Sequence, residues 1–73
     1  MKLSAFIAGL LILQPHHDSD GFHIGAEHDQ FYAYATDTPL NPEEVRQMRE
    51  LGWFQPDTEP EIYDPHDGWS AFT

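Results

Sequence analysis

The sequence contains no cysteine among its 73 residues and only three basic side chains, Lys2, Arg46 and Arg49. Without cysteine the chain forms neither a disulfide nor a thiolate metal site, which favours a reducing compartment such as the cytoplasm. With so few bases it lacks the positive surface that direct binding to nucleic acid or to an anionic membrane requires. The composition therefore disfavours both of these binding functions.

Motifs of catalysis are also missing. The chain has no Gly-rich phosphate loop, no G-x-S-x-G turn and no HExxH helix, and no base is evident beside Ser4, Ser19 or Ser70. A domain of this size rarely encloses the deep pocket in which carboxylate pKa values shift enough for acid–base work. We therefore expect that the protein is not an enzyme and needs no cofactor.

The opening stretch, MKLSAFIAGLLILQ, is mostly apolar after Lys2. A signal peptide has this composition, but no small-x-small cleavage motif follows the run, which is also too short to span a bilayer as a helix. The large apolar residues recur at the i, i+3, i+4 spacing of a core-facing helix: Leu3, Phe6, Ile7, Leu10 and Leu11. We therefore predict a helix from Ser4, its N-cap, to about Gln14, where Pro15 blocks continuation.

Two alternating segments, FHIGA and QFYAYAT, follow a polar loop and are separated by the turn residues EHD. This period-two pattern predicts a β-hairpin with one apolar face. That face should carry Phe22, Ile24, Ala26, Phe31, Ala33 and Ala35. The opposite face should carry His23, Tyr32 and Tyr34.

The segment LNPEEVRQMRELGW has signals for both ends of a helix. Asn41 is the expected N-cap, Pro42 the first helical residue, and Glu44 the partner of Asn41 in a capping box. Gly52 should end the helix in the left-handed conformation, with Trp53 folding back on it. The buried stripe should consist of Val45, Met48 and Leu51.

Near the carboxyl end, DPHDG is a strong turn signal between the segments 61–64 and 69–72. These segments should form a second hairpin. The predicted fold is a single α+β domain spanning residues 1–73, in the order αββαββ, with an antiparallel sheet packed against two helices. Its 40% hydrophobic content and ten aromatic residues suit a small folded core.

Negative charge is the most distinctive feature, with 13 acids against three bases and a net charge of −10. The stretch DTEPEIYDPHDG holds five carboxylates and no base. If it is extended, as Pro60 favours for Glu59, then Asp57, Glu59 and Glu61 leave the same side at steps of about 6.6 Å. Ile62 would then face the core. Such a row has a step comparable to that of successive phosphates on a nucleic acid strand.

The neutralising bases lie elsewhere, because Arg46 can pair with Glu43 and Glu50 on its own helix face. The first hairpin turn should also stay unneutralised. The residues expected to bind a partner are therefore Asp57, Glu59, Glu61, Tyr63, Asp64, Asp67, Glu27 and Asp29. Tyr63 would stack on an arginine of the partner. An ordinary solvated edge, protected from aggregation by its charges, is the alternative interpretation.

A calcium site is a second possibility. Residues 16–27, HHDSDGFHIGAE, match the EF-hand loop at Asp18, Asp20, Gly21 and Glu27. His16 stands in place of the first acid, and the following residues suggest a strand instead of the required helix. The five histidines form no helical metal-binding pair, so we expect no metal ligands.

AEHDQFYA near the middle, ELGWF at a helix end and a terminal GWSAFT together give the chain a resemblance to small acidic proteins of bacteriophages and mobile elements. In size, acidity and lack of catalytic motifs it is similar to anti-CRISPR proteins. This resemblance implies an inhibitor acting in the cytoplasm of a bacterial host cell. Its partner would be a basic, nucleic acid-binding surface of a CRISPR–Cas effector, by analogy a type I Cascade complex. A phage structural protein or a small calcium-binding module remains the alternative.

Overall fold

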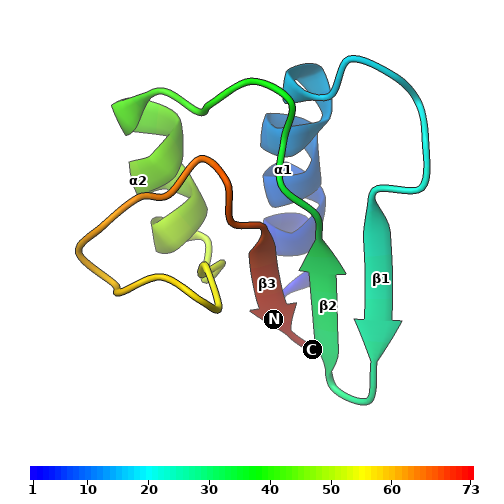
Figure 1. Cartoon of the computed structure of the whole chain (residues 1–73). Helices are drawn as coiled ribbons and strands as arrows, with labels where there is room; N and C mark the ends of the chain where they lie inside the picture. Colours follow the sequence, from blue (N-terminus) through cyan, green and yellow to red (C-terminus); the bar gives the residue numbers. More distant parts are fainter.

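The computed structural model covers Met1–Thr73 and contains two α-helices, one short 3₁₀ turn and three β-strands. In chain order these are α1 (Leu3–Leu13), η1 (Gln14–His16), β1 (Ile24–Glu27), β2 (Gln30–Ala33), α2 (Pro42–Glu50) and β3 (Trp69–Phe72). The strands form one antiparallel sheet in the order β1-β2-β3. Figure 1 shows α1 behind the sheet and α2 to one side of it. The predicted α+β class is confirmed.

The second hairpin is the part of the predicted order that is wrong. Only one of its two strands forms, and this strand, β3, pairs with β2 and not with the segment 61–64. On its other side β3 meets a single residue, because the Phe54 and Ser70 backbones exchange hydrogen bonds of 2.9 and 2.7 Å. The segment 61–64 does not pair with β3: its first two residues belong to the turn at 59–62, and the backbone of Ser70 is bonded to Phe54 instead. The element order is therefore αββαβ.

The first helix, α1, forms as expected but with a different start and a different orientation. It begins at Leu3, and its N-cap is Lys2, which makes no side-chain capping bond, so Ser4 is not the cap. The residues Phe6, Leu10 and Leu13 contact the core. Three residues predicted to face the core are exposed: Leu3, Ile7 and Leu11. The helix is apolar on all sides, and it can bury only the face that meets the sheet. Neither helix of the protein is long and apolar enough to cross a membrane.

The first hairpin is confirmed, with Ile24 opposite Ala33 and Ala26 opposite Phe31. The ring of Phe31 meets Phe6 of α1 edge-on at 4.8 Å, so this face of the sheet carries the helix. At the outer strand the expected burial fails. Phe22 is fully exposed and Ile24 is 57% exposed. The single helix on this face covers β2 and β3 but leaves the outer side of β1 open.

Both ends of α2 match the sequence signals. The Asn41 side chain accepts a bond from the Glu44 N–H at 2.8 Å, and Glu44 Oε1 accepts one from the Asn41 N–H at 3.0 Å. At the other end Gly52 has a φ of +99°, and the Trp53 N–H donates to Met48 O. Met48 is fully buried. Local signals therefore fix both helix ends.

The core lies where α1, α2 and the sheet meet, around two buried tryptophans. Trp53 stacks on Phe6 at 5.7 Å, and Trp69 stacks on Tyr63 at 6.2 Å. Trp53 sits so close to α1 that a Cβ at Gly9 would overlap its indole ring. Because the polypeptide between the two tryptophans has few core residues of its own, it loops out beside α2, and this loop carries most of the predicted site.

Candidate functional site

The acidic segment folds as three consecutive β-turns, each with a proline at its second position: Pro56, Pro60 and Pro65. Proline suits this position because its ring holds φ near the value that the turn needs. The closing bonds run from the Thr58 N–H to Gln55 O (3.4 Å), from Ile62 to Glu59 (3.0 Å) and from Asp67 to Asp64 (3.2 Å). The expected extended row is therefore wrong. Ile62 is also misplaced, since it is 53% exposed and not in the core.

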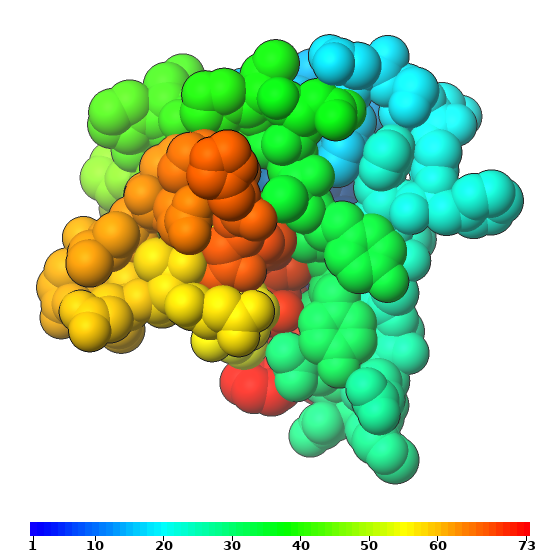
Figure 2. All heavy atoms as spheres, in the orientation of Figure 1, coloured from blue at the N-terminus to red at the C-terminus, as the bar shows by residue number.

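Three carboxylates of this segment are exposed and free of ion pairs. Asp57 and Glu61 lie at the third positions of their turns, and Glu59 is the first residue of the second turn. None of the three pairs with a lysine, arginine or histidine. Figure 2 shows the segment, in yellow and orange, as a lobe on the side of the molecule away from β1. We call residues 56–68 the acidic lobe.

The other two acids of the lobe serve its internal structure. Oδ2 of Asp67 accepts bonds from the Asp57 N–H at 3.1 Å and from the Thr58 hydroxyl at 2.8 Å. Oδ1 of Asp64 accepts a bond of 2.8 Å from the His66 N–H within the third turn. Both side chains are partly buried. Asp64 and Asp67 therefore position the lobe and leave less of their charge open to a partner.

A buried amide that the sequence analysis missed ties the two ends of the lobe together. Gln55, only 7% exposed, accepts a bond from the Asp64 N–H at 3.0 Å. Its Nε2 donates to Asp64 O at 2.7 Å and to Asp67 O at 3.2 Å. No periodic pattern marks this glutamine, because it belongs to neither a helix nor a strand. The only sequence signal for the role of Gln55 is its place directly before Pro56, ahead of two further x-Pro turns.

Tyr63 has a structural role that the sequence analysis did not predict. Its hydroxyl accepts a bond from the Leu40 N–H at 2.8 Å, and its ring lies against Trp69. The side chain is partly buried against the core, and its ring also lines an open groove beside α2. Through this bond Tyr63 anchors the acidic lobe to Leu40, two positions before α2 begins.

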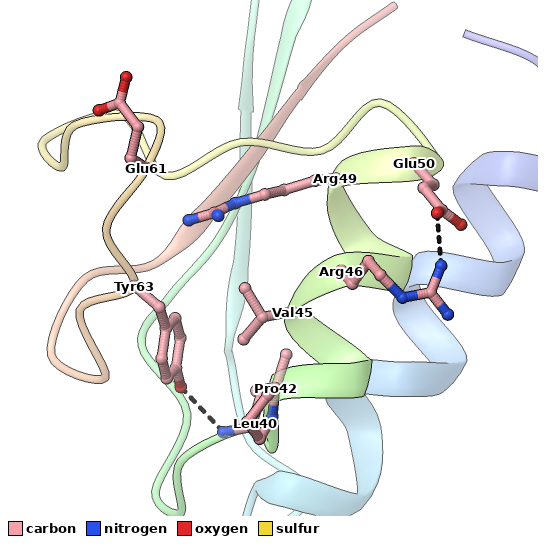
Figure 3. A pocket seen from close by; sticks show the side chains of 8 residues that line it. All are labelled: Leu40, Pro42, Val45, Arg46, Arg49, Glu50, Glu61 and Tyr63. Carbon is pink, nitrogen blue, oxygen red and sulfur yellow. Dashed lines mark hydrogen bonds and ion pairs between the residues drawn. The ribbon is translucent and has the colours of Figure 1, made fainter.

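Between α2 and the acidic lobe lies an open groove of about 580 Å³. Arg49 crosses it (Figure 3). Its guanidinium donates a bond of 2.7 Å to Ile62 O. Figure 3 also shows the Glu61 carboxylate pointing away from this guanidinium, and the two form no ion pair. Arg46 pairs with Glu43 and Glu50 on the helix surface, as predicted. The lobe is thus attached to α2 through a backbone carbonyl, which leaves its carboxylates unneutralised.

Glu27 and Asp29 do not join the acidic lobe. They lie at the β1–β2 turn, which Figure 1 places at the bottom of the molecule, away from the lobe. Glu27 accepts a bond from the Tyr32 hydroxyl at 3.1 Å, which raises the pKa of Tyr32. The backbone carbonyl of Asp29 accepts two bonds from Thr73, at 2.7 and 3.0 Å. The predicted residues therefore form two separate acidic surfaces.

The segment that resembles an EF-hand does not form one. Its last residue, Glu27, lies in β1 and no helix follows it. No group of three or more histidine and acidic side chains comes together as a set of metal ligands. His16 instead joins η1 to α2 through a contact of 2.9 Å with Glu44, which lowers the pKa of that carboxyl. His17 stacks on His23 at 4.0 Å, and burial lowers its pKa.

Comparison with known proteins adds no relative: no family model matches the chain, and no curated protein or solved structure shows a significant similarity to it.

Proposed function

We propose that the protein is an acidic inhibitor that binds a basic, nucleic acid-binding surface of a larger complex through its acidic lobe. The proposed complex is the CRISPR–Cas effector implied by the resemblance, a type I Cascade assembly. The observation that carries the proposal is the state of Asp57, Glu59 and Glu61, which are exposed, unpaired and held on one braced loop.

The charge distribution supports binding to a positive surface. The net charge is −10, and the cations are kept from the lobe's carboxylates: Arg46 is paired on α2 and Arg49 contacts a backbone carbonyl. Unneutralised charges on one side of a small protein steer it toward a basic partner and raise the association rate. The same charges repel nucleic acid, so the proposed target is a protein surface.

The architecture of the lobe supports a binding role for a second reason. Three proline turns and the Gln55 bonds fix the backbone before any partner arrives. A preformed loop loses little conformational freedom on binding, so more of the electrostatic attraction contributes to affinity. The carboxylates stand at the corners of turns, so the proposed mimicry of a polyanion rests on their charge and rigidity and not on an extended, evenly spaced row.

The decisive variant combines Asp57→Asn, Glu59→Gln and Glu61→Gln. At about 0.5 kcal/mol for each exposed charge, the three substitutions should reduce the binding free energy by about 1.5 kcal/mol. This corresponds to roughly tenfold weaker binding. The measurement is the affinity for purified Cascade at two salt concentrations, with displacement of target DNA as the second readout. Wild-type binding should weaken steeply at high salt, and the variant should show a smaller salt dependence.

The control variant removes the same number of charges elsewhere, as Asp18→Asn, Asp20→Asn and Glu43→Gln. All three of these residues are exposed and lie outside the acidic lobe. This control should bind like the wild type, because the lobe is intact. An unchanged affinity in the lobe variant, or an equal loss of affinity in both variants, would contradict the proposal.

A further inference from the structure

The edge of the sheet that no other backbone segment meets is β1. The opposite edge, β3, is met by Phe54, whose backbone exchanges two hydrogen bonds with Ser70. Along β1, the Tyr34 N–H donates to His23 O at 2.8 Å, and Gly25 and Glu27 lie opposite Tyr32 and Gln30. Since the polar groups of an antiparallel strand alternate in direction, those of Ile24 and Ala26 point away from β2. These outward N–H and C=O groups have no strand partner within the chain.

Natural proteins usually protect such an edge with proline, lysine or inward charges. Between Phe22 and Ala26 the chain has none of these. Phe22 is instead fully exposed, and Ile24 is 57% exposed. Ile24 and Leu11 of α1 line one groove of about 640 Å³, so apolar side chains continue from the edge strand onto the helix, and Asp18 and Asp20 line the same groove.

The helix extends this surface without adding charge. Leu3, Ile7 and Leu11 follow one another at four-residue intervals and are 73%, 47% and 61% exposed. The helix Leu3–Leu13 contains no charged residue. The helix and residues 22–26 carry none of the protein's carboxylates, so a second, equally acidic molecule meets less negative charge there, with Asp18 and Asp20 lying beside this surface.

From these observations we propose that β1 is a self-association edge, at which two copies of this chain pair antiparallel and join their sheets into one of six strands. The occupant of the edge is a second copy, because β1 complements itself under a two-fold axis through Gly25. Ile24 then lies opposite Ala26 of the other copy, and each exchanges both of its outward backbone bonds with its partner.

This register also separates the charges of the edge. Glu27 is the only charged residue of β1, and it falls opposite position 23 of the other copy, which is a histidine. The two Glu27 positions are offset by four residues, or about 13 Å along the strands. Gly25 lies at the axis, where two backbones approach most closely, and its own sheet face is already covered by Tyr34 and Tyr32.

The test uses a matched pair of isoleucines. Ile24→Lys places a positive charge at the edge, while Ile62→Lys places the same charge on the acidic lobe, where the side chain is 53% exposed. The oligomeric state is measured by sedimentation over a wide range of protein concentration. The wild type and Ile62→Lys should form dimers as concentration rises, and Ile24→Lys should remain monomeric.

A second variant, Ala26→Pro, acts on the backbone by removing one outward N–H without breaking the β1–β2 ladder. It too should remain monomeric. In the wild type, the amide protons of Ile24 and Ala26 should become protected from exchange as concentration rises. A wild type that stays monomeric throughout, or dimers that persist in both edge variants, would overturn the proposal. So would a monomer whose edge takes up only a foreign peptide.

Discussion

Gln55 offers the sharpest test of how the acidic lobe is held. Its amide makes three hydrogen bonds to the backbone of Asp64 and Asp67 from a side chain that is 7% exposed. At about 1 kcal/mol for each bond, Gln55→Ala should lower the free energy of unfolding by about 3 kcal/mol. Water reaches the partly exposed partners and should reduce this to about 2 kcal/mol. A chain of 73 residues is expected to have a total stability of roughly 4–10 kcal/mol, so the loss is large.

Gln55→Glu removes the two hydrogen bonds that the side chain donates while keeping the shape of the side chain. The new carboxylate can still accept a bond from the Asp64 N–H, but it cannot donate to the two carbonyl oxygens and repels them. At neutral pH this variant should therefore be less stable than Gln55→Ala. Because the fold raises the pKa of the new carboxyl, its penalty is present at neutral pH and disappears as the pH falls through that raised value. Acidification should therefore move its stability toward that of the wild type.

The assay is urea unfolding followed by tryptophan fluorescence, since Trp53 and Trp69 are both buried. Gln47→Glu is the matched control, because Gln47 is exposed on α2 and the charge change is the same. If Gln55→Glu is as stable as this control at neutral pH, the bracing role of Gln55 is refuted. Gln55→Ala should also weaken partner binding, although it removes no charge.

Gly9→Ala should destabilise the protein by up to about 2 kcal/mol in urea unfolding. Overlap with Trp53 costs about 1–3 kcal/mol, and the better helix propensity of alanine offsets roughly 1 kcal/mol of this. A more stable variant would show that the indole moves freely. The stability of the wild type should also fall as the pH drops below 6.5. Burial and His23 lower the pKa of His17 in the folded state, so the unfolded chain binds more protons in that range. His17→Phe should flatten this part of the pH profile of unfolding, and an unchanged profile would assign the effect to other groups.

The parts of the fold that were predicted correctly depend on neighbouring residues. Asn41, Pro42 and Glu44 act within three positions of one another at the start of α2, and Gly52 acts on the turn just before it, so α2 begins and ends where they indicate. The β1–β2 hairpin also follows its alternating pattern. The strand predicted at 61–64 failed because Pro60 suits a β-turn as well as an extended chain. In the turn conformation the segment bonds to Gln55 and to Arg49 of α2, both of which lie outside it.

The candidate site, like the fold, could be predicted only in part from the sequence. The sequence identified the acidic stretch and showed that few cations could neutralise it. It could not distinguish the exposed acids Asp57, Glu59 and Glu61 from Asp64 and Asp67, which brace the lobe. All five are carboxylates in one short stretch, and only their hydrogen-bond partners separate them.

Composition alone thus determined that this protein is strongly acidic, free of disulfides and poor in cations, because these are sums over residues that no fold alters. Local patterns determined the ends of α2 and the first hairpin. The tertiary structure decided which face of α1 is buried, which carboxylates remain free and which edge of the sheet is open. Each of these depends on what packs against the residue, and that neighbour comes from a distant part of the chain.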